Sequence, residues 1–96
     1  MASFRFTKQV QKDIQRIIEH GREQFSIKQV ASYLDELEML FALLAENPSM
    51  ARLRSELNPP VRVHPFKSHV ILFEETGNDE ILILTLRHAR ENWLEP

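Results

Sequence analysis

Residues 69–86 read HVILFEETGNDEILILTL, two apolar runs on either side of a turn. Valine, isoleucine and phenylalanine favour strands, whereas Gly77 and Asn78 tolerate the positive φ of a tight hairpin turn. The second run, Ile81-Leu82-Ile83-Leu84, does not alternate, which is typical of a strand buried on both faces. The stretch predicts a β-hairpin whose second strand is central in a sheet. We expect helices to cover one face and the other face to stay open for a partner.

Further strands are predicted on both sides of this hairpin. Val61 to His64 alternates between apolar and polar residues, and Pro65 either confines this strand to an edge or marks its end. Residues 49–60 favour a short helical turn and then an extended segment that leads into the strand. Near the N-terminus, Phe4 and Phe6 alternate with polar residues and indicate one more short strand.

Two helices are predicted between the first strand and the meander. Thr7 is an N-cap candidate and Gly21 a C-cap candidate, so the first helix is placed at about 8–20. Ser26 and Gln29 have capping-box spacing, so the second begins near Ile27 and ends at Asn47-Pro48. Its apolar positions recur at steps of three and four, as in a helix packed lengthwise against its neighbours: Ile27, Val30, Leu34, Leu37, Phe41 and Leu44. The predicted fold class is α+β, of order β-α-α-β-β-β, with a helical hairpin packed on one face of a mainly antiparallel sheet.

Length and composition limit the classes of function that this chain can have. The chain has 96 residues, no cysteine and a formal net charge of −2, so we expect one domain, 1–96, without disulfides. No apolar run approaches the ~20 residues that cross a bilayer, and the N-terminus lacks a signal-peptide core. We therefore expect a cytoplasmic protein. The charge lacks the basic excess of proteins that grip phosphates, so no direct sequence-specific nucleic-acid binding is expected.

The spacing of the residues gives little support for a metal site, a cofactor site or a catalytic nucleophile. The four histidines, His20, His64, His69 and His88, match no metal-ligand pattern, and two glycines cannot build a phosphate-binding loop. Ser68 and His69 are adjacent, and in a strand they would point to opposite faces, which argues against a triad-type hydrogen bond. We expect no metal, no cofactor and no catalytic residue.

A basic cluster is the most informative feature. Arg52, Arg54, Arg62 and Lys67 lie close together with one acid, Glu56, and a second basic group follows the last strand. Arginine, histidine and tryptophan are favoured at protein interfaces, although a solvated polar rim is the alternative interpretation. The predicted target-contact residues are Arg52, Arg54, Arg62, Arg87, His88, Arg90 and Trp93.

The order of these motifs resembles the ParE-type toxins of the RelE/ParE superfamily. The similarity rests on the end of the second helix (LLAENP, 43–48), on Met50-x-Arg52-x-Arg54, on VRxHPFKSHVI at 61–71 and on ILxLxHARxxW at 83–93. It spans nearly the whole chain. Ala89 and Glu91 depart from the pattern, because glycine and a second basic residue are common there, and they weaken the C-terminal basic patch.

The resemblance implies the toxin of a bacterial toxin–antitoxin pair, non-enzymatic, with DNA gyrase as its target. It also implies a cognate antitoxin, bound as a hetero-oligomer through groove and strand-addition contacts. The predicted antitoxin contacts are Phe4, Phe6, Ile14 and Leu37.

Two alternatives stay open. The RelE branch of the superfamily cleaves mRNA on the ribosome, for which Arg62, Arg87, His88 and Arg90 are the candidates here. The only tyrosine, Tyr33, lies inside the second predicted helix and not at the C-terminus, where that branch often has one. The other alternative is a degenerate member that survives only as an antitoxin-binding partner.

Overall fold

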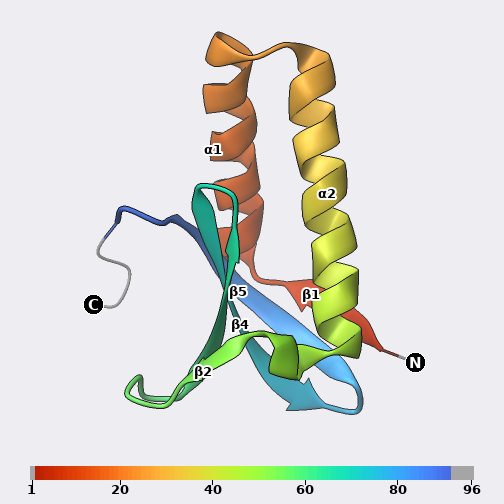
Figure 1. The fold of residues 1–96 in the computed structure, drawn as a ribbon, viewed down its shortest axis with the longest axis vertical. Helices are drawn as coiled ribbons and strands as arrows, with labels where there is room; N and C mark the ends of the chain where they lie inside the picture. Colours follow the sequence, from red (N-terminus) through yellow and green to blue (C-terminus); the bar gives the residue numbers. More distant parts are fainter. Residues whose placement is uncertain (1, 92–96) are drawn as a thin grey trace.

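The computed structural model describes residues 2–91 and contains one mixed sheet of order β1-β5-β4-β3-β2. Only β1 runs parallel to its neighbour β5, and the other strand pairs are antiparallel. Two helices lie side by side on one face of this sheet (Figure 1). The strands are β1 (Ser3–Phe6), β2 (Arg52–Arg54), β3 (Val61–Phe66), β4 (His69–Gly77) and β5 (Glu80–His88). The predicted α+β fold class is confirmed.

The helices begin where their caps predict. In α1 (Lys8–Gln24) the Thr7 hydroxyl accepts a hydrogen bond from the Val10 N–H. In α2 (Ile27–Glu46) Ser26 and Gln29 form both halves of the capping box. A single 3₁₀ turn, η1 (Pro48–Met50), follows α2. Each cap satisfies backbone N–H groups that have no partner inside the helix, which fixes its starting residue.

The prediction that Gly21 ends the first helix is wrong. Helix α1 continues to Gln24, with Phe25 as its C-cap, and Gly21 is buried inside it. A Cβ atom added at Gly21 would lie 2.9 Å from Cγ2 of Val30 on α2. The glycine is therefore needed for the close approach of the two helices and not for a left-handed turn.

The segment before Val61 contains a strand that the sequence did not predict. Arg52–Arg54 pairs with β3 and adds the edge strand β2, so the observed order is β-α-α-β-β-β-β. Pro65 lies in the part of β3 beyond this pairing, as expected for a residue without an N–H. In the β4–β5 turn, Gly77 and Asn78 have positive φ as predicted.

The main core lies between the helices and the sheet, and a second cluster occupies the opposite face. Phe41 and Leu44 of α2 pack on Phe73, Ile81 and Ile83 of the sheet. On the opposite face, Val61, Val63, Val70 and Leu72 are buried, with Leu57 and Leu84 packed against them. The expectation of an uncovered second face is therefore wrong at its centre, because the chain's own side chains bury these four residues. β5 is an interior strand, paired on both sides as predicted, although β4 lies at the middle of the sheet.

A bulge in β5 sets which side chains face the helices. The pairing passes from Phe73–Ile83 to Leu72–Thr85 and leaves Leu84 as an extra residue. After this extra residue, Leu86 joins Ile81 and Ile83 in the main core. After the bulge, the residues that would otherwise point toward the helices point away from them, and the reverse, just before the basic residues at the end of β5.

Candidate functional site

Three of the arginines predicted to contact a target lie on the sheet face without helices, which we call the helix-free face. Arg52 and Arg54 of β2 pair with valines of β3, and Arg87 of β5 pairs with Val70 of β4. Directly paired residues share a face of the sheet, and these valines belong to the second cluster. The structure therefore brings Arg52, Arg54 and Arg87 to one face, around an apolar centre.

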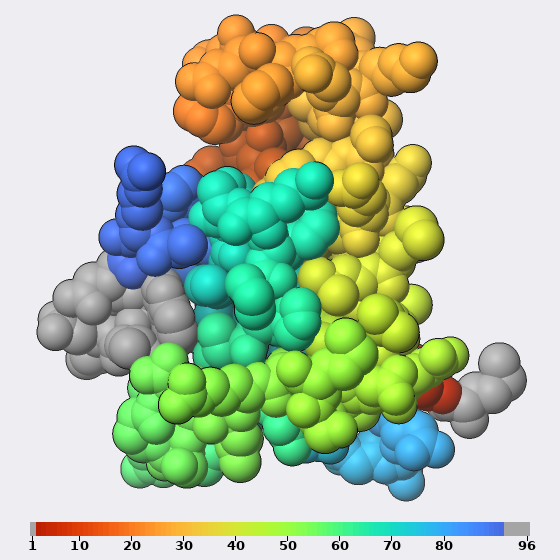
Figure 2. All heavy atoms as spheres, in the orientation of Figure 1, coloured from red at the N-terminus to blue at the C-terminus, as the bar shows by residue number. Residues whose placement is uncertain are grey.

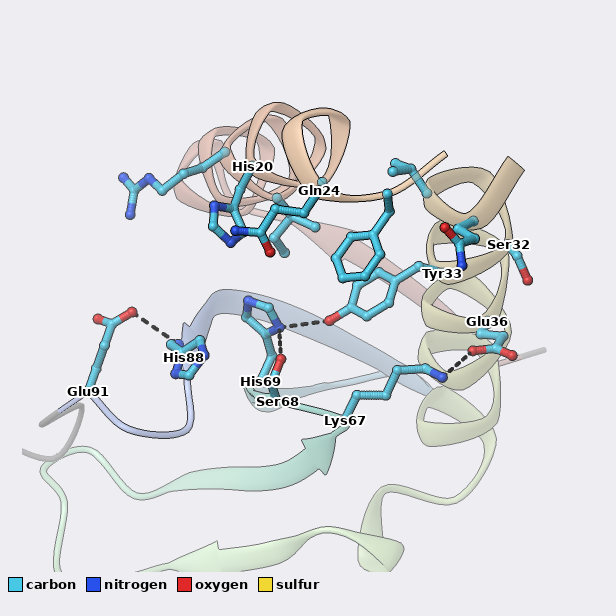
Figure 3. A pocket seen from close by; sticks show the side chains of 16 residues that line it. His20, Gln24, Ser32, Tyr33, Glu36, Lys67, Ser68, His69, His88 and Glu91 are labelled. Atoms are coloured by element: carbon cyan, nitrogen blue, oxygen red, sulfur yellow. Dashed lines mark hydrogen bonds and ion pairs between the residues drawn. The ribbon is translucent and has the colours of Figure 1, made fainter. Parts of the chain in front are cut away.

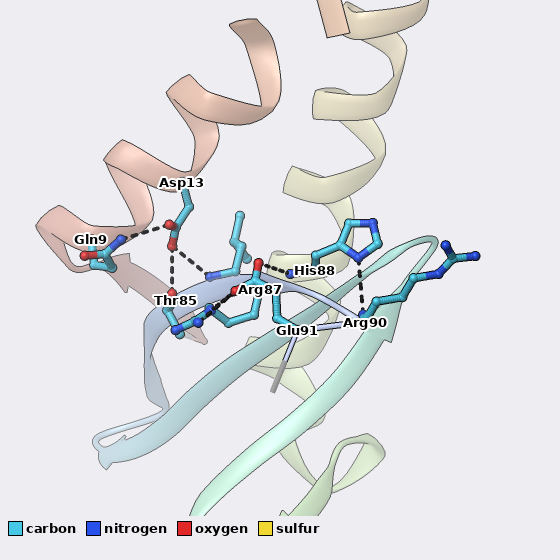
Figure 4. Close-up of polar contacts among 8 residues, drawn as sticks. Gln9, Asp13, Thr85, Arg87, His88, Arg90 and Glu91 are labelled. Atoms are coloured by element: carbon cyan, nitrogen blue, oxygen red, sulfur yellow. Dashed lines mark hydrogen bonds and ion pairs between the residues drawn. The ribbon is translucent and has the colours of Figure 1, made fainter. Parts of the chain in front are cut away.

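Two of these arginines form ion pairs with nearby carboxylates. Arg54 pairs with Glu56, and this hydrogen bond lowers the pKa of the Glu56 carboxyl. Nη2 of Arg87 lies 2.7 Å from Oε2 of Glu91 (Figure 4). The pKa of Glu91 is lowered mainly by the backbone N–H of His88 and then by Arg87. The Arg87–Glu91 pair is solvent-exposed and therefore weak, so Arg87 remains able to exchange its partner.

The remaining predicted target residues do not join this face. Arg62 pairs with Phe73 and lies on the helix side, where it bonds to Glu75 and to the Ala51 carbonyl, each at 2.9 Å. His88 pairs with His69, and Arg90 follows β5, its N–H donating to Nδ1 of His88. Trp93 lies outside the described residues. The seven residues are thus distributed over more than one surface.

The predicted antitoxin residues are only partly accessible. Phe4 and Ile14 are partly buried against the main core, and the ring centroid of Phe4 lies 5.6 Å from that of Phe41. Phe6 is 39% exposed. Leu37 is only 3% exposed, so a partner bound to the folded surface would not reach it.

A pocket of about 870 Å³ lies between the helical hairpin and one end of the sheet. Figure 2 shows this region as a hollow bounded by the hairpin tip, the β3–β4 turn and the end of β5. The hairpin contributes apolar walls, including Ile17, Phe25 and Val30, and the sheet end contributes His69 and His88. We call it the histidine pocket.

Tyr33 and His69 form its central polar contact. The Tyr33 hydroxyl lies 2.7 Å from Nδ1 of His69 (Figure 3). The His69 and His88 rings lie edge to face, with centroids 5.5 Å apart. Burial, and then the neighbouring His88, lowers the pKa of His69. Burial raises the pKa of Tyr33, and a hydrogen bond with Ser68 opposes this effect. Both side chains are thereby kept neutral near pH 7.

The prediction that Ser68 and His69 point to opposite faces of a strand is wrong. Ser68 lies in the β3–β4 turn and not in a strand, and its hydroxyl is 3.5 Å from Nδ1 of His69. At this length the contact is marginal, and it joins Ser68 to the Tyr33 group. The sequence analysis did not predict the Tyr33–His69 contact, because the two residues are 36 positions apart. The only indication in the sequence is that Tyr33, whose side chain ends in a hydroxyl, directly precedes Leu34, one of the regularly spaced apolar residues of α2.

Neither metal-binding nor membrane-spanning features are found in residues 2–91. No group of three or more histidine, aspartate or glutamate side chains in this range could hold a metal ion. Neither helix in the same range combines the length and apolar character of a membrane span.

Comparison with known proteins gives one consistent result. Residues 4–93 match the family described as ParE toxin of type II toxin-antitoxin system, parDE. The chain is 29% identical to Toxin ParE3 of Caulobacter vibrioides over 86 residues, covering 90% of this chain and 85% of that protein. It is 26% identical to Toxin ParE of Escherichia coli over 90 residues, covering 94% and 87%. With two helices on a mixed sheet and a family match over nearly its whole length, the chain belongs to the ParE toxin family of type II toxin–antitoxin systems.

Proposed function

We propose that this chain inhibits DNA gyrase by protein–protein binding in the cytoplasm, without catalysis, and that a cognate antitoxin neutralises it. Membership of a toxin–antitoxin family implies an antitoxin partner. Gyrase as the target follows from the resemblance to ParE-type toxins, and the fold supplies a surface suited to such contact.

The observation that carries the proposal is the arrangement of the helix-free face. Arg52, Arg54 and Arg87 lie on this face, where the partly exposed Leu57 and Leu84 pack over four buried residues of β3 and β4. Arginines beside partly exposed apolar side chains have the composition of a protein interface. The carboxylate partner of Arg87, Glu91, is close in sequence and solvent-exposed, so an acidic target surface can replace it at little cost.

The ribonuclease alternative finds no comparable support. Its candidates would need to converge on one scissile phosphate. Arg87 lies on the helix-free face, whereas Arg62 and His88 lie on the helix side. Arg62 is also held by Glu75 and the Ala51 carbonyl. These residues do not form one catalytic group.

Neutralisation can use the β1 edge of the sheet. β1 pairs only with β5 among the described strands, so its other edge can accept an added strand. Phe6 is exposed beside this edge and packs edge-on against the Phe41 ring. A partner strand placed there would gain backbone hydrogen bonds and cover Phe6, one of the four predicted antitoxin contacts.

A supercoiling assay with purified gyrase tests the proposal. Adding the chain should inhibit supercoiling and accumulate cleaved DNA, and a triple variant, Arg52→Ala, Arg54→Ala and Arg87→Ala, should inhibit much less. Lys12→Ala, on the exposed side of α1, is the matched control and should inhibit like the unmodified chain. Unchanged supercoiling without cleaved DNA would contradict the proposal. Cut mRNA from translating ribosomes would favour the alternative.

A further inference from the structure

The histidine pocket contains hydrogen-bond donors that have no acceptor among residues 2–91. Nδ1 of His88 accepts the backbone N–H of Arg90 at 3.2 Å, so the neutral ring must carry its proton on Nε2. Nδ1 of His69 is bonded to the Tyr33 hydroxyl. Burial keeps Tyr33 protonated and His69 neutral. In the tautomer in which the tyrosine hydroxyl donates to Nδ1, His69 also carries its proton on Nε2. Within residues 2–91 neither Nε2–H group has a hydrogen-bond partner.

Both carboxylates that line the pocket are already engaged. Glu36 pairs with Lys67 at 2.9 Å, and Glu91 bonds to Arg87 and to the backbone N–H of His88. On the α1 side, Arg16 lines the pocket and forms no ion pair within the described residues. The two His Nε2–H groups and the Arg16 guanidinium are therefore available to a ligand that enters the pocket. An anionic group is the acceptor that suits such donors.

The residues that line the pocket favour an aromatic ring as the remaining part of the ligand. Five rings line it, from Phe25, Tyr33, His20, His69 and His88, together with the aliphatic side chains of Ile17 and Val30. Figure 3 shows the ring of His69 between Tyr33 of α2 and the side of α1 that carries His20 and Gln24. A flat ring would stack against such walls, and the volume of about 870 Å³ lies within the usual range for small-molecule sites.

We propose that the histidine pocket binds a small aromatic anion, a flat ring that carries a phosphate or a carboxylate, held by Arg16, His69 and His88. The ring lies among the apolar walls, and the anionic group accepts hydrogen bonds from the two histidines. Arg16, His69 and His88 do not belong to the helix-free face, so the proposed site does not depend on gyrase inhibition.

Binding should be linked to proton uptake. The charged or titratable groups around His69 come from both helices, the β3–β4 turn and the end of β5: Asp13, Arg16, His20, Tyr33, Glu36, Lys67, His88 and Glu91. In the empty pocket, burial and the neighbouring His88 oppose protonation of His69. An anion bound beside the two imidazole rings reverses this balance and favours the charged imidazole. The affinity should therefore increase as the pH falls.

Four probes test the contributions of the ring and of the anionic group to binding. Adenosine 5′-monophosphate combines a ring with phosphate, and indole-3-acetate combines a ring with carboxylate. Adenosine has a ring without charge, and inorganic phosphate has charge without a ring. Titration calorimetry should show that at least one ring-bearing anion binds about tenfold tighter than adenosine or phosphate, a difference of ~1.4 kcal/mol. Binding of indole-3-acetate, whose carboxylate stays ionised over this range, should tighten by about threefold to tenfold from pH 8 to pH 6.

Two variants and a control locate the site. His69→Asn keeps an acceptor for Tyr33 but removes the Nε2–H donor, and Arg16→Gln removes the guanidinium. Each should weaken binding by about fivefold or more, as expected for the loss of a charge-assisted bond. Arg22→Gln, on the same helix but outside the pocket lining, should bind like the unmodified chain. Thermal unfolding checks that each variant is folded. The proposal is overturned if neither ring-bearing anion binds at millimolar concentration, if adenosine or phosphate binds equally well, or if folded His69→Asn and Arg16→Gln bind normally.

Discussion

The hydroxyl of Thr85 donates a 2.7 Å hydrogen bond to Oδ2 of Asp13, a residue 72 positions earlier in the chain. The same oxygen accepts the Leu86 N–H at 3.0 Å, and Oδ1 accepts the Gln9 amide at 2.9 Å (Figure 4). Asp13 is only 4% exposed. Its carboxylate joins α1 to β5 just after the bulge, where the strand reverses its alternation.

Replacing Asp13 with alanine should lower the free energy of unfolding by about 2–4 kcal/mol, because the buried Leu86 N–H would be left without an acceptor, at ~1–3 kcal/mol, and the bonds from Thr85 and Gln9 would also be lost. Asp13→Asn keeps an oxygen acceptor and should cost less. Urea unfolding measures both. Asp35→Ala, on the exposed face of α2, should change stability by less than ~0.5 kcal/mol. Equal stability of Asp13→Ala and the unmodified chain would show that this contact does not hold the strand.

Much of the fold is predictable because its signals are local. Ser26 and Gln29 are three positions apart, and their capping box fixes the start of α2. Gly77 and Asn78 fix the β4–β5 turn for the same reason. The family resemblance depends on the order of such local motifs, and the family match over residues 4–93 agrees with it.

The candidate site was less predictable because its geometry depends on distant contacts. Strict alternation from Ile81 and Ile83 would place Arg87 on the helix side and His88 on the helix-free face. The bulge at Leu84 reverses both, and nothing adjacent in the sequence marks it. Strand β2 was missed because Arg-Leu-Arg is too short to show a period. The Tyr33–His69 bond was missed because only the tertiary fold brings its partners together.

The close approach of Gly21 and Val30 predicts an unusual effect of adding a methyl group. Glycine to alanine inside a helix normally stabilises by ~1 kcal/mol. Here the new Cβ would lie 2.9 Å from Val30 Cγ2, and the stiff valine side chain cannot move away freely. Overpacking costs ~1–3 kcal/mol, so Gly21→Ala should be neutral or destabilising in urea unfolding. In a Val30→Ala background the same change should stabilise by ~1 kcal/mol. The same effect in both backgrounds would contradict the contact.

Tyr33 should ionise at a higher pH than a free tyrosine. It is the only tyrosine in the chain, so phenolate absorbance near 295 nm reports this residue alone. Burial raises its pKa above the ordinary value of 10.0. The folded state therefore favours the neutral phenol, and the stability that this adds is lost as the pH rises from 10 through the folded-state pKa. Chain unfolded in urea gives the reference midpoint, and equal midpoints for folded and unfolded chain would show that the phenol is not buried.

His69 should make the fold less stable in mild acid. Its pKa is lowered from the ordinary value of 6.5 by burial and then by His88. Between the folded-state pKa and 6.5 the unfolded chain binds more protons than the folded chain. The stability contributed by neutral His69 is therefore complete above pH 6.5 and is lost as the pH falls through the lowered value. Thermal unfolding at pH 7.5 and 5.5 should show a smaller decrease for His69→Asn than for the unmodified chain. Identical decreases would remove His69 as the cause.

Substitutions of Arg52 and Arg62 should distinguish a residue that contacts the target from a residue that stabilises the fold. Arg52 is exposed on the helix-free face, so Arg52→Ala should leave thermal stability unchanged and raise the concentration needed to inhibit gyrase supercoiling severalfold. Arg62 bonds to Glu75 and to the Ala51 carbonyl on the helix side. Arg62→Ala should therefore lower the free energy of unfolding by about 1 kcal/mol, since one of its two bonds is to a half-exposed carboxylate. Its inhibition, measured well below the unfolding temperature, should stay close to that of the unmodified chain. If Arg62→Ala loses inhibition while folded and Arg52→Ala does not, the target binds the helix side, and the assignment of the helix-free face is wrong.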